Sequence, residues 1–418
     1  MKLRTANALA LIAAMSGMSC LWGSDVPAHP PLASKAPAVD LKLTRVIMLS
    51  RHGVRSPTQG PEELRKLAAR EWPTWSVGPG ELTAHGERGE RILGGYFRAA
   101  YAADGLVSSQ ECPSRQAVFV WADNADQRTR VSGQALLDGM FPGCGLKAEY
   151  APLDAPDPLF HPLETGNCPM DAAAAEQSVR RRVAGNLDVL GPTYDKALTA
   201  VAPILQNPKL LEAHNEIQVK GRDLRFEGPL KTAATAVEVF LLEYEEGLPA
   251  QQVGWGGAAT LENLAVLLPA HNIYSDLLRK DPYIAAHNGT PIAERIVGAL
   301  QGQQRLTVLM GHDTNLANLA ALLGVSWELP GQPDSTPPGG TLAFEVGRAA
   351  DGQQFVRTVF YYQTPDQLRE LQALDIRHPP GATMVRIPAC ARGRDGLCTV
   401  EEISSVLDQA EVASCRNH

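Results

Sequence analysis

The chain has 418 residues, of which 44% are hydrophobic and 20% are charged. It is long enough for two or three globular domains, and its composition excludes a collagen-like or disordered protein. Its 38 Lys and Arg residues against 46 Asp and Glu residues give a net charge of −8, so the chain as a whole repels nucleic acid and anionic membranes. A bound anion must therefore be held by a local cluster of basic residues.

The N-terminal residues are typical of an export signal. A basic segment precedes the apolar run of residues 8–15, and small residues follow it. This run is shorter than the ~20 residues that a membrane-spanning helix needs. We therefore expect a signal peptide over residues 1–22 and an unstructured, proline-containing lead-in over residues 23–40. Cys20 lies near the expected cleavage site, so lipidation of this cysteine stays open, and without it no membrane attachment is expected.

Three short apolar runs, rich in β-branched or large residues, predict strands that are buried on both faces. They span residues 45–50, 117–122 and 306–310. Helical patterns separate or follow them, one of them capped by Thr83 and another beginning at Thr314. Strands that alternate with helices predict an α/β layer.

Residues 166–295 lack such strand-like runs. Ala- and Leu-rich stretches with helical periodicity replace them, notably residues 232–244 and 261–268. This change of pattern predicts an inserted, smaller, all-α cap domain over residues 166–295.

Two later stretches, residues 341–346 and 355–361, show the alternation that is typical of antiparallel strands. We expect them to extend the first sheet. The expected fold class is therefore α/β, with a central mixed sheet flanked by helices. The sheet domain is discontinuous in sequence and comprises residues 41–165 and 296–418.

A cluster of charged residues follows each of the three predicted buried strands. The clusters are residues 51–55, 123–130 and 311–313. Because ligands of open α/β sheets bind at the carboxyl ends of the strands, we expect the three clusters to converge on one site. Any one Arg-His pair fits a surface or capping role, but several arginines and histidines together favour an anion site, because unpaired buried charge is costly.

The residue types in these clusters suit phosphoryl chemistry. Arg51, Arg55 and one of Arg128 or Arg130 offer forks of donors that match phosphoryl oxygens. Two histidines offer a nucleophile and a hydrogen-bond donor, and Asp313 offers a proton.

The motif RHGVRSP at residues 51–57, together with His312 and Asp313, resembles the histidine acid phosphatase family of the histidine phosphatase superfamily. The runs at residues 311–319 (GHDTNLANL) and 329–340 (LPGQPDSTPPGG) are similar to its bacterial periplasmic phytase and acid phosphatase branch, to which glucose-1-phosphatases are close. The resemblance extends from about residue 43 to the C-terminus. It implies a periplasmic enzyme with an α/β domain, a helical cap and a cleft between them.

The resemblance also implies roles for single residues. His52 is similar to the nucleophile that becomes phosphohistidine, and Asp313 is similar to the proton donor. The phosphate-binding residues implied are Arg51, Arg55, Arg128 and His312. Arg128 is preferred to Arg130 because residues 127–130 (QRTR) resemble an ERTR-like segment of the family in which the first arginine is functional.

Three further residues are substrate-binding candidates. Glu238 matches a cap-helix glutamate that faces the cleft in phytases, although a solvated helix face fits its sequence context equally well. Thr58 and Gln59 stand where phytases commonly read Thr-Lys. The missing cation at position 59 predicts a weaker preference for phytate over simple monoesters.

The function expected from the resemblance is two-step hydrolysis of small phosphomonoesters such as phytate or sugar phosphates, with phytase (myo-inositol hexakisphosphate phosphohydrolase) activity. We expect the enzyme to need no metal ion or cofactor and to bind no nucleic acid. We also expect it to be a monomer. Three alternatives remain open: a glucose-1-phosphatase-like sugar phosphatase, a periplasmic phosphate-ester binding protein that does not hydrolyse its ligand, and a mutase of the same superfamily.

Six cysteines remain when Cys20 is set aside, and none of them forms a CxxC motif. In an exported chain this favours structural disulfides over a zinc site, with buried free thiols as the alternative. Six cysteines can pair in about 15 ways. The resemblance to the phytase branch implies the pairs Cys112–Cys144, Cys168–Cys415 and Cys390–Cys398.

Overall fold

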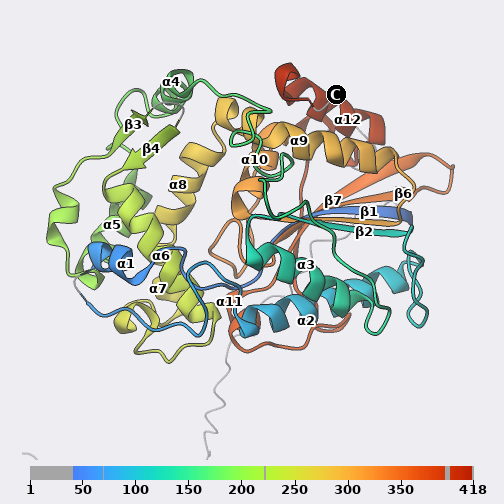
Figure 1. Ribbon diagram of the computed structural model, residues 1–418, viewed down its shortest axis with the longest axis horizontal. Helices are drawn as coiled ribbons and strands as arrows, with labels where there is room; N and C mark the ends of the chain where they lie inside the picture. Colours follow the sequence, from blue (N-terminus) through green and yellow to red (C-terminus); the bar gives the residue numbers. More distant parts are fainter. Residues whose placement is uncertain (1–40, 69, 221–222, 391–395, 417–418) are drawn as a thin grey trace, which may run out of the picture. The chain divides into compact units, whose positions relative to one another are not determined.

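The computed structural model describes residues 41–68, 70–220, 223–390 and 396–416 (Figure 1). The expected signal peptide, the lead-in and Cys20 lie outside the described residues. Within the described part, no helix has both the length and the apolar character needed to cross a membrane.

A six-stranded mixed sheet forms the centre of the larger core (Figure 1). Its strands, in spatial order, are β2 (Val118–Ala122), β5 (Leu306–Gly311), β1 (Lys42–Arg51), β6 (Thr341–Arg348), β7 (Gln354–Tyr362) and β8 (Gly381–Met384). The first three strands run parallel, and β6, β7 and β8 are added antiparallel. The expected mixed sheet, extended by antiparallel strands from the C-terminal part, is confirmed.

The register of the parallel strands decides where the charged clusters meet. Every residue of β5 is buried, as expected of a strand with a neighbour on each side and helices on both faces. In the pairing of β1 with β5, Arg51 lies opposite Gly311. The residues that follow these two strands therefore leave the sheet side by side at its carboxyl edge.

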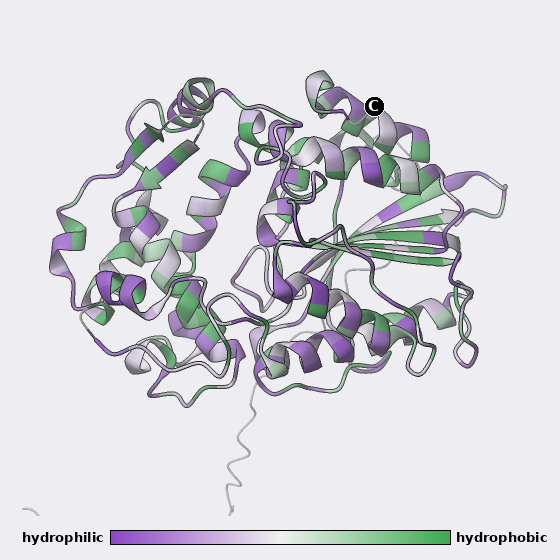
Figure 2. Cartoon of the chain, viewed as in Figure 1, coloured by the Kyte–Doolittle hydropathy of each residue, from purple (hydrophilic) through white to green (hydrophobic). Residues whose placement is uncertain are grey.

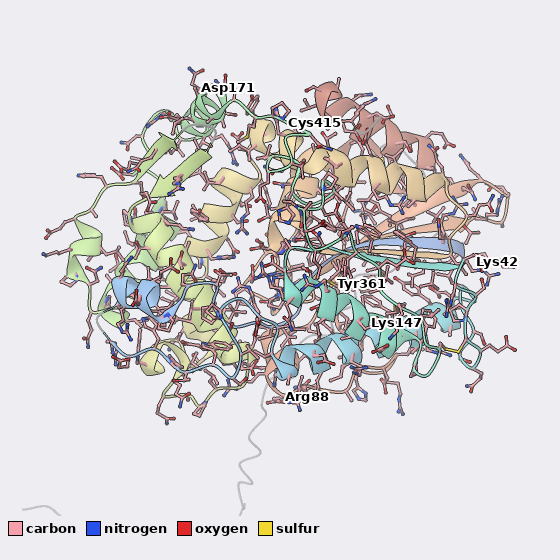
Figure 3. All side chains as sticks on the ribbon, viewed as in Figure 1. Lys42, Arg88, Lys147, Asp171, Tyr361 and Cys415 are labelled. Carbon is pink, nitrogen blue, oxygen red and sulfur yellow. A yellow bond between two sulfur atoms is a disulfide. The ribbon has the colours of Figure 1, made fainter. Side chains whose placement is uncertain are left out.

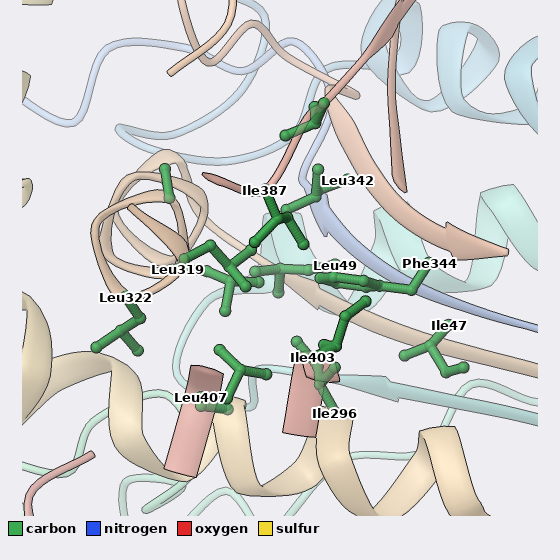
Figure 4. Packing of buried hydrophobic residues seen from close by; sticks show 14 of the residues in the cluster. Ile47, Leu49, Ile296, Leu319, Leu322, Leu342, Phe344, Ile387, Ile403 and Leu407 are labelled. Carbon is green, nitrogen blue, oxygen red and sulfur yellow. The ribbon is translucent and has the colours of Figure 1, made fainter. Parts of the chain in front are cut away.

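Helices cover both faces of this sheet. One face carries α2 (Ala84–Ala103) and α3 (Gln127–Met140), and the other carries α9 (Pro282–Gln301), α10 (Asp313–Leu323) and α12 (Val400–Ala410) (Figure 1). The second interface is hydrophobic: Leu49 and Phe344 of the sheet belong to the same buried cluster as Leu319 of α10 and Leu407 of α12 (Figure 4). Figure 2 shows the same division, with hydrophobic strands between helices that present polar residues outward.

Local signals explain where two of these helices begin. The side chain of Thr83 accepts a hydrogen bond from the backbone N–H of Gly86, so α2 has the expected cap. Gly86 is also required for packing, because a Cβ at this position would lie 2.0 Å from the carbonyl oxygen of Val54. This close approach holds the loop after β1 against α2. α10 begins at Asp313, one residue before the expected start, with His312 as its N-cap.

A second hydrophobic core belongs to the helical part of the chain. It contains α4 (Ala172–Arg182), α5 (Pro192–Ile204), α6 (Pro229–Glu245), α7 (Leu261–Leu267) and α8 (Pro269–Arg279). The segment after α1 (Pro61–Leu67) joins this core through Trp72, which stacks on Phe240 of α6. α9 instead packs with α10 and α12 on the sheet, so the helices of the second core end with α8.

The helical part also contains a two-stranded antiparallel hairpin, which the expectation of an all-helical insertion did not include. Its strands are β3 (Glu216–Lys220) and β4 (Asp223–Glu227). Ile217 and Phe226 face each other and are buried, whereas their neighbours along each strand are polar. Two five-residue strands with one buried residue each are too short to stand out from helical periodicity.

Short elements and disulfides complete the fold. The remaining elements are α11 (Pro365–Arg369) and 3₁₀ helices at Pro208–Leu211, Val253–Gly256, Pro388–Cys390 and Ala413–Cys415. Disulfides join Cys112 to Cys144, Cys168 to Cys415, and Cys390 to Cys398, which is the implied pairing. The second of these links the segment before α4 to the C-terminal residues, and Figure 3 labels Cys415 together with Asp171, the residue that caps α4.

Candidate active site

The three charged clusters meet at the carboxyl edge of the sheet. The backbone N–H of His52 donates to the carbonyl oxygen of Gly311 at 3.0 Å, which joins the end of β1 to the end of β5. The backbone N–H of Asp123, just after β2, donates to the carbonyl oxygen of Met310 at 3.0 Å. The geometry thus brings together segments that lie far apart in sequence.

The His52 ring is held with one nitrogen committed. Its Nδ1 lies 2.8 Å from the carbonyl oxygen of Gly53, and since a carbonyl only accepts, Nδ1 carries the proton and Nε2 keeps its lone pair. Burial lowers the pKa of His52 well below its usual range, and the charges of Arg128 and Arg51 lower it further. The ring is therefore neutral, with a lone pair available for attack.

Arg51 and Arg55 converge on one carboxylate oxygen. Glu238 Oε1 accepts from Nη2 of Arg51 at 3.0 Å and from Nη2 of Arg55 at 2.8 Å. Burial alone would raise the pKa of this carboxyl, but the charges of Arg55, His271 and Arg51 lower it to about 2. Arg51 also donates to Asp334 at 3.1 Å. Glu238 lines the cleft and accepts from the Nη2 group of each arginine.

Of the two arginines after β2, Arg128 lines the cleft. Its Nη2 donates to Asp126 Oδ2 at 2.6 Å, and its Nη1 donates to the carbonyl oxygen of Gly80 at 3.1 Å. Arg130 donates to the carbonyl oxygen of Asn124 and lies over the ring of Tyr150. The structure therefore separates two arginines that are two residues apart in sequence.

His312 caps α10 and is oriented by two aspartates. Its Nε2 lies 2.9 Å from Asp126 Oδ2, and its Nδ1 lies 3.6 Å from Asp123 Oδ2. Its ring meets that of His52 edge-on, with 5.5 Å between the centroids. This places the His312 imidazole beside that of His52.

Asp313 is the first residue of α10, and its Oδ2 is ion-paired with Arg279 of α8. Burial raises the pKa of Asp313, but Arg279 and Arg51 outweigh this and hold the pKa well below its usual range. These charges therefore favour the ionised carboxylate. A bound phosphate dianion would compete for these arginines and raise the pKa of Asp313, as a proton donor requires.

A cleft of about 780 Å³ connects these groups. Its lining comes from the sheet edge, from the loop after β1 and from α6 and α8 of the helical part. The candidate residues in the lining are Arg55, Thr58, Gln59, Arg128, Glu238, His312 and Asp313. Arg51 and His52 are almost fully buried and adjoin this lining through Glu238 and His312.

Besides Asp123 and Asp334, four residues of the site were not singled out from sequence. Asp126 orients His312 and Arg128, Arg279 pairs with Asp313, and His271 is one of the charges that depress the pKa of Glu238. His161 Nε2 lies 2.9 Å from Asp123 Oδ2, and the hydrogen bond between them raises the pKa of His161. Only Asp126 had a usable signal, because it lies within the charged cluster after β2.

Among the residues that the structure describes, two groups of side chains bring potential metal ligands within 4.8 Å of one another. They are Asp123, Asp126 and His312, and Glu238, His271 and Asp313. The carboxylates of Asp126, Glu238 and Asp313 are each ion-paired with an arginine. A guanidinium that is paired with a carboxylate repels a metal ion bound to the same carboxylate. The charge distribution therefore suits an anionic ligand better than a metal ion.

Comparison with known proteins identifies relatives along nearly the whole chain. Residues 42–361 match the sequence profile of the histidine phosphatase superfamily (branch 2). The chain is 32% identical to phytase AppA of Escherichia coli (strain K12), over 93% of this chain and 97% of that protein. It is 30% identical to glucose-1-phosphatase of Providencia rettgeri, over 92% of this chain and 95% of that protein.

Solved structures with the same fold include bacterial phytases. The apo form of Hafnia alvei phytase has a TM-score of 0.86 and 34% sequence identity, and covers 92% of this chain and 100% of that chain. The same phytase in complex with myo-inositol hexakis sulphate has the same TM-score. The phytase from Citrobacter braakii has a TM-score of 0.86 at 32% identity, over 90% of this chain and 99% of that chain.

Proposed function

This chain belongs to the histidine phosphatase superfamily (branch 2), as its sequence motifs indicate, and we propose that it is an exported acid phosphatase with phytase activity. The observation that carries the proposal is the environment of His52: a neutral, buried imidazole with a free Nε2, surrounded by Arg51, Arg55 and Arg128. Arginine forks bind phosphoryl oxygens, and a neutral imidazole is the form that attacks phosphorus.

Substrate binding begins with an exchange of anions. A phosphoryl group that enters the site takes the Nη2 donors of Arg51 and Arg55, which contact Glu238 in the structure. The carboxylate of Glu238 gives way, and Arg128 and His312 supply further donors. These fixed positive groups stabilise the charge that builds up on the equatorial oxygens, so the reaction needs no metal ion for that purpose.

The first chemical step is in-line transfer to His52. Nε2 forms a bond to phosphorus while the bond from phosphorus to the ester oxygen breaks, and Asp313 gives its proton to the leaving alkoxide. Arg279 and Arg51 hold the pKa of Asp313 low, so its protonation depends on the added negative charge of the substrate and on acidic solution.

The second step returns the enzyme to its starting state. Water attacks the phosphohistidine, Asp313 accepts the proton of that water, and the bond between phosphorus and Nε2 breaks. Inorganic phosphate leaves, and Glu238 can return to the arginines. The same carboxyl group acts first as acid and then as base.

The substrate class is proposed to be phytate and related monoesters, in agreement with the names of the phytase relatives. A cleft of about 780 Å³ with Arg128, Arg279 and Lys231 in its lining is suited to a ligand with several phosphates. The expected export signal and the three disulfides support a periplasmic location, and we propose that the mature enzyme is a monomer.

A substrate panel tests this function. Release of inorganic phosphate is measured at acidic pH for phytate, glucose 1-phosphate and p-nitrophenyl phosphate. The highest kcat/KM on phytate supports the proposal, whereas a preference for glucose 1-phosphate would favour the sugar phosphatase suggested by the glucose-1-phosphatase relatives. Binding without phosphate release would identify a binding protein, and transfer of phosphate between sugar positions would identify a mutase.

A further inference from the structure

One face of α6 forms a wall of the cleft. The residues of α6 that line the cleft are Lys231, Ala234, Thr235 and Glu238. The last three follow Lys231 by three, four and seven residues, so all four lie along one side of the helix. Glu238 marks the catalytic end of this face through its contacts with Arg51 and Arg55. Lys231 lies two turns earlier, about 10 Å away along the axis at 1.5 Å per residue. A phosphorylated inositol ring extends over such a distance.

The ammonium group of Lys231 is positioned by a neutral side chain. Its Nζ donates to the hydroxyl oxygen of Tyr274 at 3.3 Å and lies 4.9 Å from the centroid of that ring. Tyr274 belongs to α8, lines the same cleft, and is itself held by an edge-on contact with Phe226. A tyrosine hydroxyl orients the cation without neutralising it, so the charge stays available to an external anion.

The other cations described at the catalytic end have different partners. Arg55, Arg128 and Arg279 are ion-paired with Glu238, Asp126 and Asp313, respectively. An anion must compete with a carboxylate for each of these three groups. The hydroxyl of Tyr274 carries no negative charge, so it does not compete with an anion for Lys231 in this way.

The position of Lys231 within α6 adds a second indication. α6 begins at Pro229, with Gly228 as its N-cap and no side-chain cap hydrogen bond, so Lys231 lies in the first turn. The N-terminus of a helix carries positive partial charge and disfavours a lysine there. An anion bound by Lys231 would offset that repulsion, whereas the backbone N–H of Leu230 in the same turn already donates to Asn215 Oδ1.

We infer that Lys231 and Tyr274 form a second anion subsite, which binds a phosphate group of an inositol polyphosphate other than the one being hydrolysed. Gln59, in the lining of the same cleft, stands where phytases commonly have lysine. Lys231 thus supplies from the helical wall a cation that position 59 of the loop after β1 lacks. This inference rests on the proposed function, because only a substrate with several phosphates uses both subsites.

The kinetic test compares Lys231→Gln with the wild-type enzyme on phytate and on p-nitrophenyl phosphate. Because a charge-assisted contact is lost for phytate alone, the ratio of the two kcat/KM values should fall about 10-fold at low ionic strength, and less in high salt. Lys231→Arg should keep most of the ratio. Lys209→Gln is the matched control: Lys209 is an exposed lysine elsewhere in the helical part, and its substitution makes the same change of charge.

An inhibition test separates the subsite from turnover. Myo-inositol hexakis sulphate carries several anionic groups, whereas inorganic phosphate occupies the catalytic subsite alone. With p-nitrophenyl phosphate as the substrate, Lys231→Gln should raise the inhibition constant of the hexakis sulphate about 10-fold relative to that of phosphate. Tyr274→Phe should raise this ratio in the same direction, because the hydroxyl that orients the ammonium is gone.

The outcomes distinguish this inference from the proposed function. If wild-type enzyme releases no phosphate from phytate, the phytase proposal fails. The inhibition test, which uses p-nitrophenyl phosphate as the substrate, still shows whether the subsite exists. If wild-type enzyme hydrolyses phytate but both ratios in Lys231→Gln equal those of Lys209→Gln, the subsite is overturned. Thermal unfolding of each variant shows whether its fold is retained, and Tyr274→Phe keeps the test valid if Lys231→Gln is unstable, because an unchanged inhibition ratio in that variant also overturns the subsite.

Discussion

Replacement of Glu238 by Gln tests whether an internal carboxylate competes with substrate for the arginines. In the structure, Oε1 of Glu238 accepts from Arg51 at 3.0 Å and from Arg55 at 2.8 Å. A phosphoryl group needs the same donors. Gln keeps the size and the carbonyl acceptor of Glu but removes the negative charge, so inorganic phosphate should bind the variant more tightly.

The size of the effect follows from the depressed pKa. A fall from 4.5 to about 2 is worth about 3 kcal/mol at ~1.36 kcal/mol per pKa unit. This free energy favours the carboxylate in the arginine forks and opposes its displacement. The Gln carbonyl still accepts hydrogen bonds from the arginines, so the substitution removes only part of this free energy. We therefore expect the inhibition constant of phosphate to fall about 10-fold.

The assay is competitive inhibition by inorganic phosphate, with p-nitrophenyl phosphate as substrate. Glu164→Gln is the control, since Glu164 also lines the cleft but is exposed and contacts His161 instead of the arginines. An inhibition constant that stays the same or rises in Glu238→Gln, relative to this control, would refute the competition.

The ion pairs of Glu238 with Arg51 and Arg55 also predict how the stability of the fold depends on pH. Because the pKa of Glu238 is lower in the folded state than its ordinary value of 4.5, its ionisation stabilises the fold above pH 4.5. That contribution is lost as the pH falls through about 2. Glu238→Gln should therefore unfold at a lower temperature than wild type near neutral pH, with a difference that narrows as the pH falls below 4.5. A difference that stays constant with pH contradicts the ion pair.

Three other substitutions test the roles of single residues. His52→Ala should lower kcat by ~10⁴ or more while thermal unfolding stays cooperative, because the covalent route is lost; a folded variant with more than a tenth of the activity contradicts the nucleophile. Asp313→Asn should reduce kcat on alkyl phosphates far more than on p-nitrophenyl phosphate, whose leaving group needs little protonation; equal losses on the two substrates would show that Asp313 is not the acid. Gln59→Lys should raise the ratio of kcat/KM for phytate to that for p-nitrophenyl phosphate at low ionic strength; an unchanged ratio means that position 59 does not contact the substrate.

The sheet and the convergence of the charged clusters were predictable because both follow from local rules. Buried parallel strands have nearly continuous apolar sequences, and ligands bind at their carboxyl ends. Residues 51–55 and 311–313 therefore indicated one site from two distant motifs. The hairpin formed by β3 and β4 was missed because each strand has only five residues and buries one side chain of the Ile217–Phe226 pair.

The choice between Arg128 and Arg130 shows a limit of the motif. Both arginines lie in the first turn of α3, and the sequence context alone left either one able to bind phosphate. The fold turns Arg128 toward Asp126 and the cleft and turns Arg130 toward Asn124 and Tyr150. Side-chain direction around a helix turn, rather than residue type, separates them.

By itself, the sequence determined which chemistry is present: a histidine, arginines and an acid in motifs that resemble those of one family. Only the tertiary structure decided which carboxylate neutralises which cation. Glu238 reaches Arg51 and Arg55 from α6, and Arg279 reaches Asp313 from α8. No local pattern encodes these pairs, because they depend on how separate elements pack. The low pKa values of His52 and Asp313 arise in the same way, since burial and the field of distant charges exist only in the folded chain.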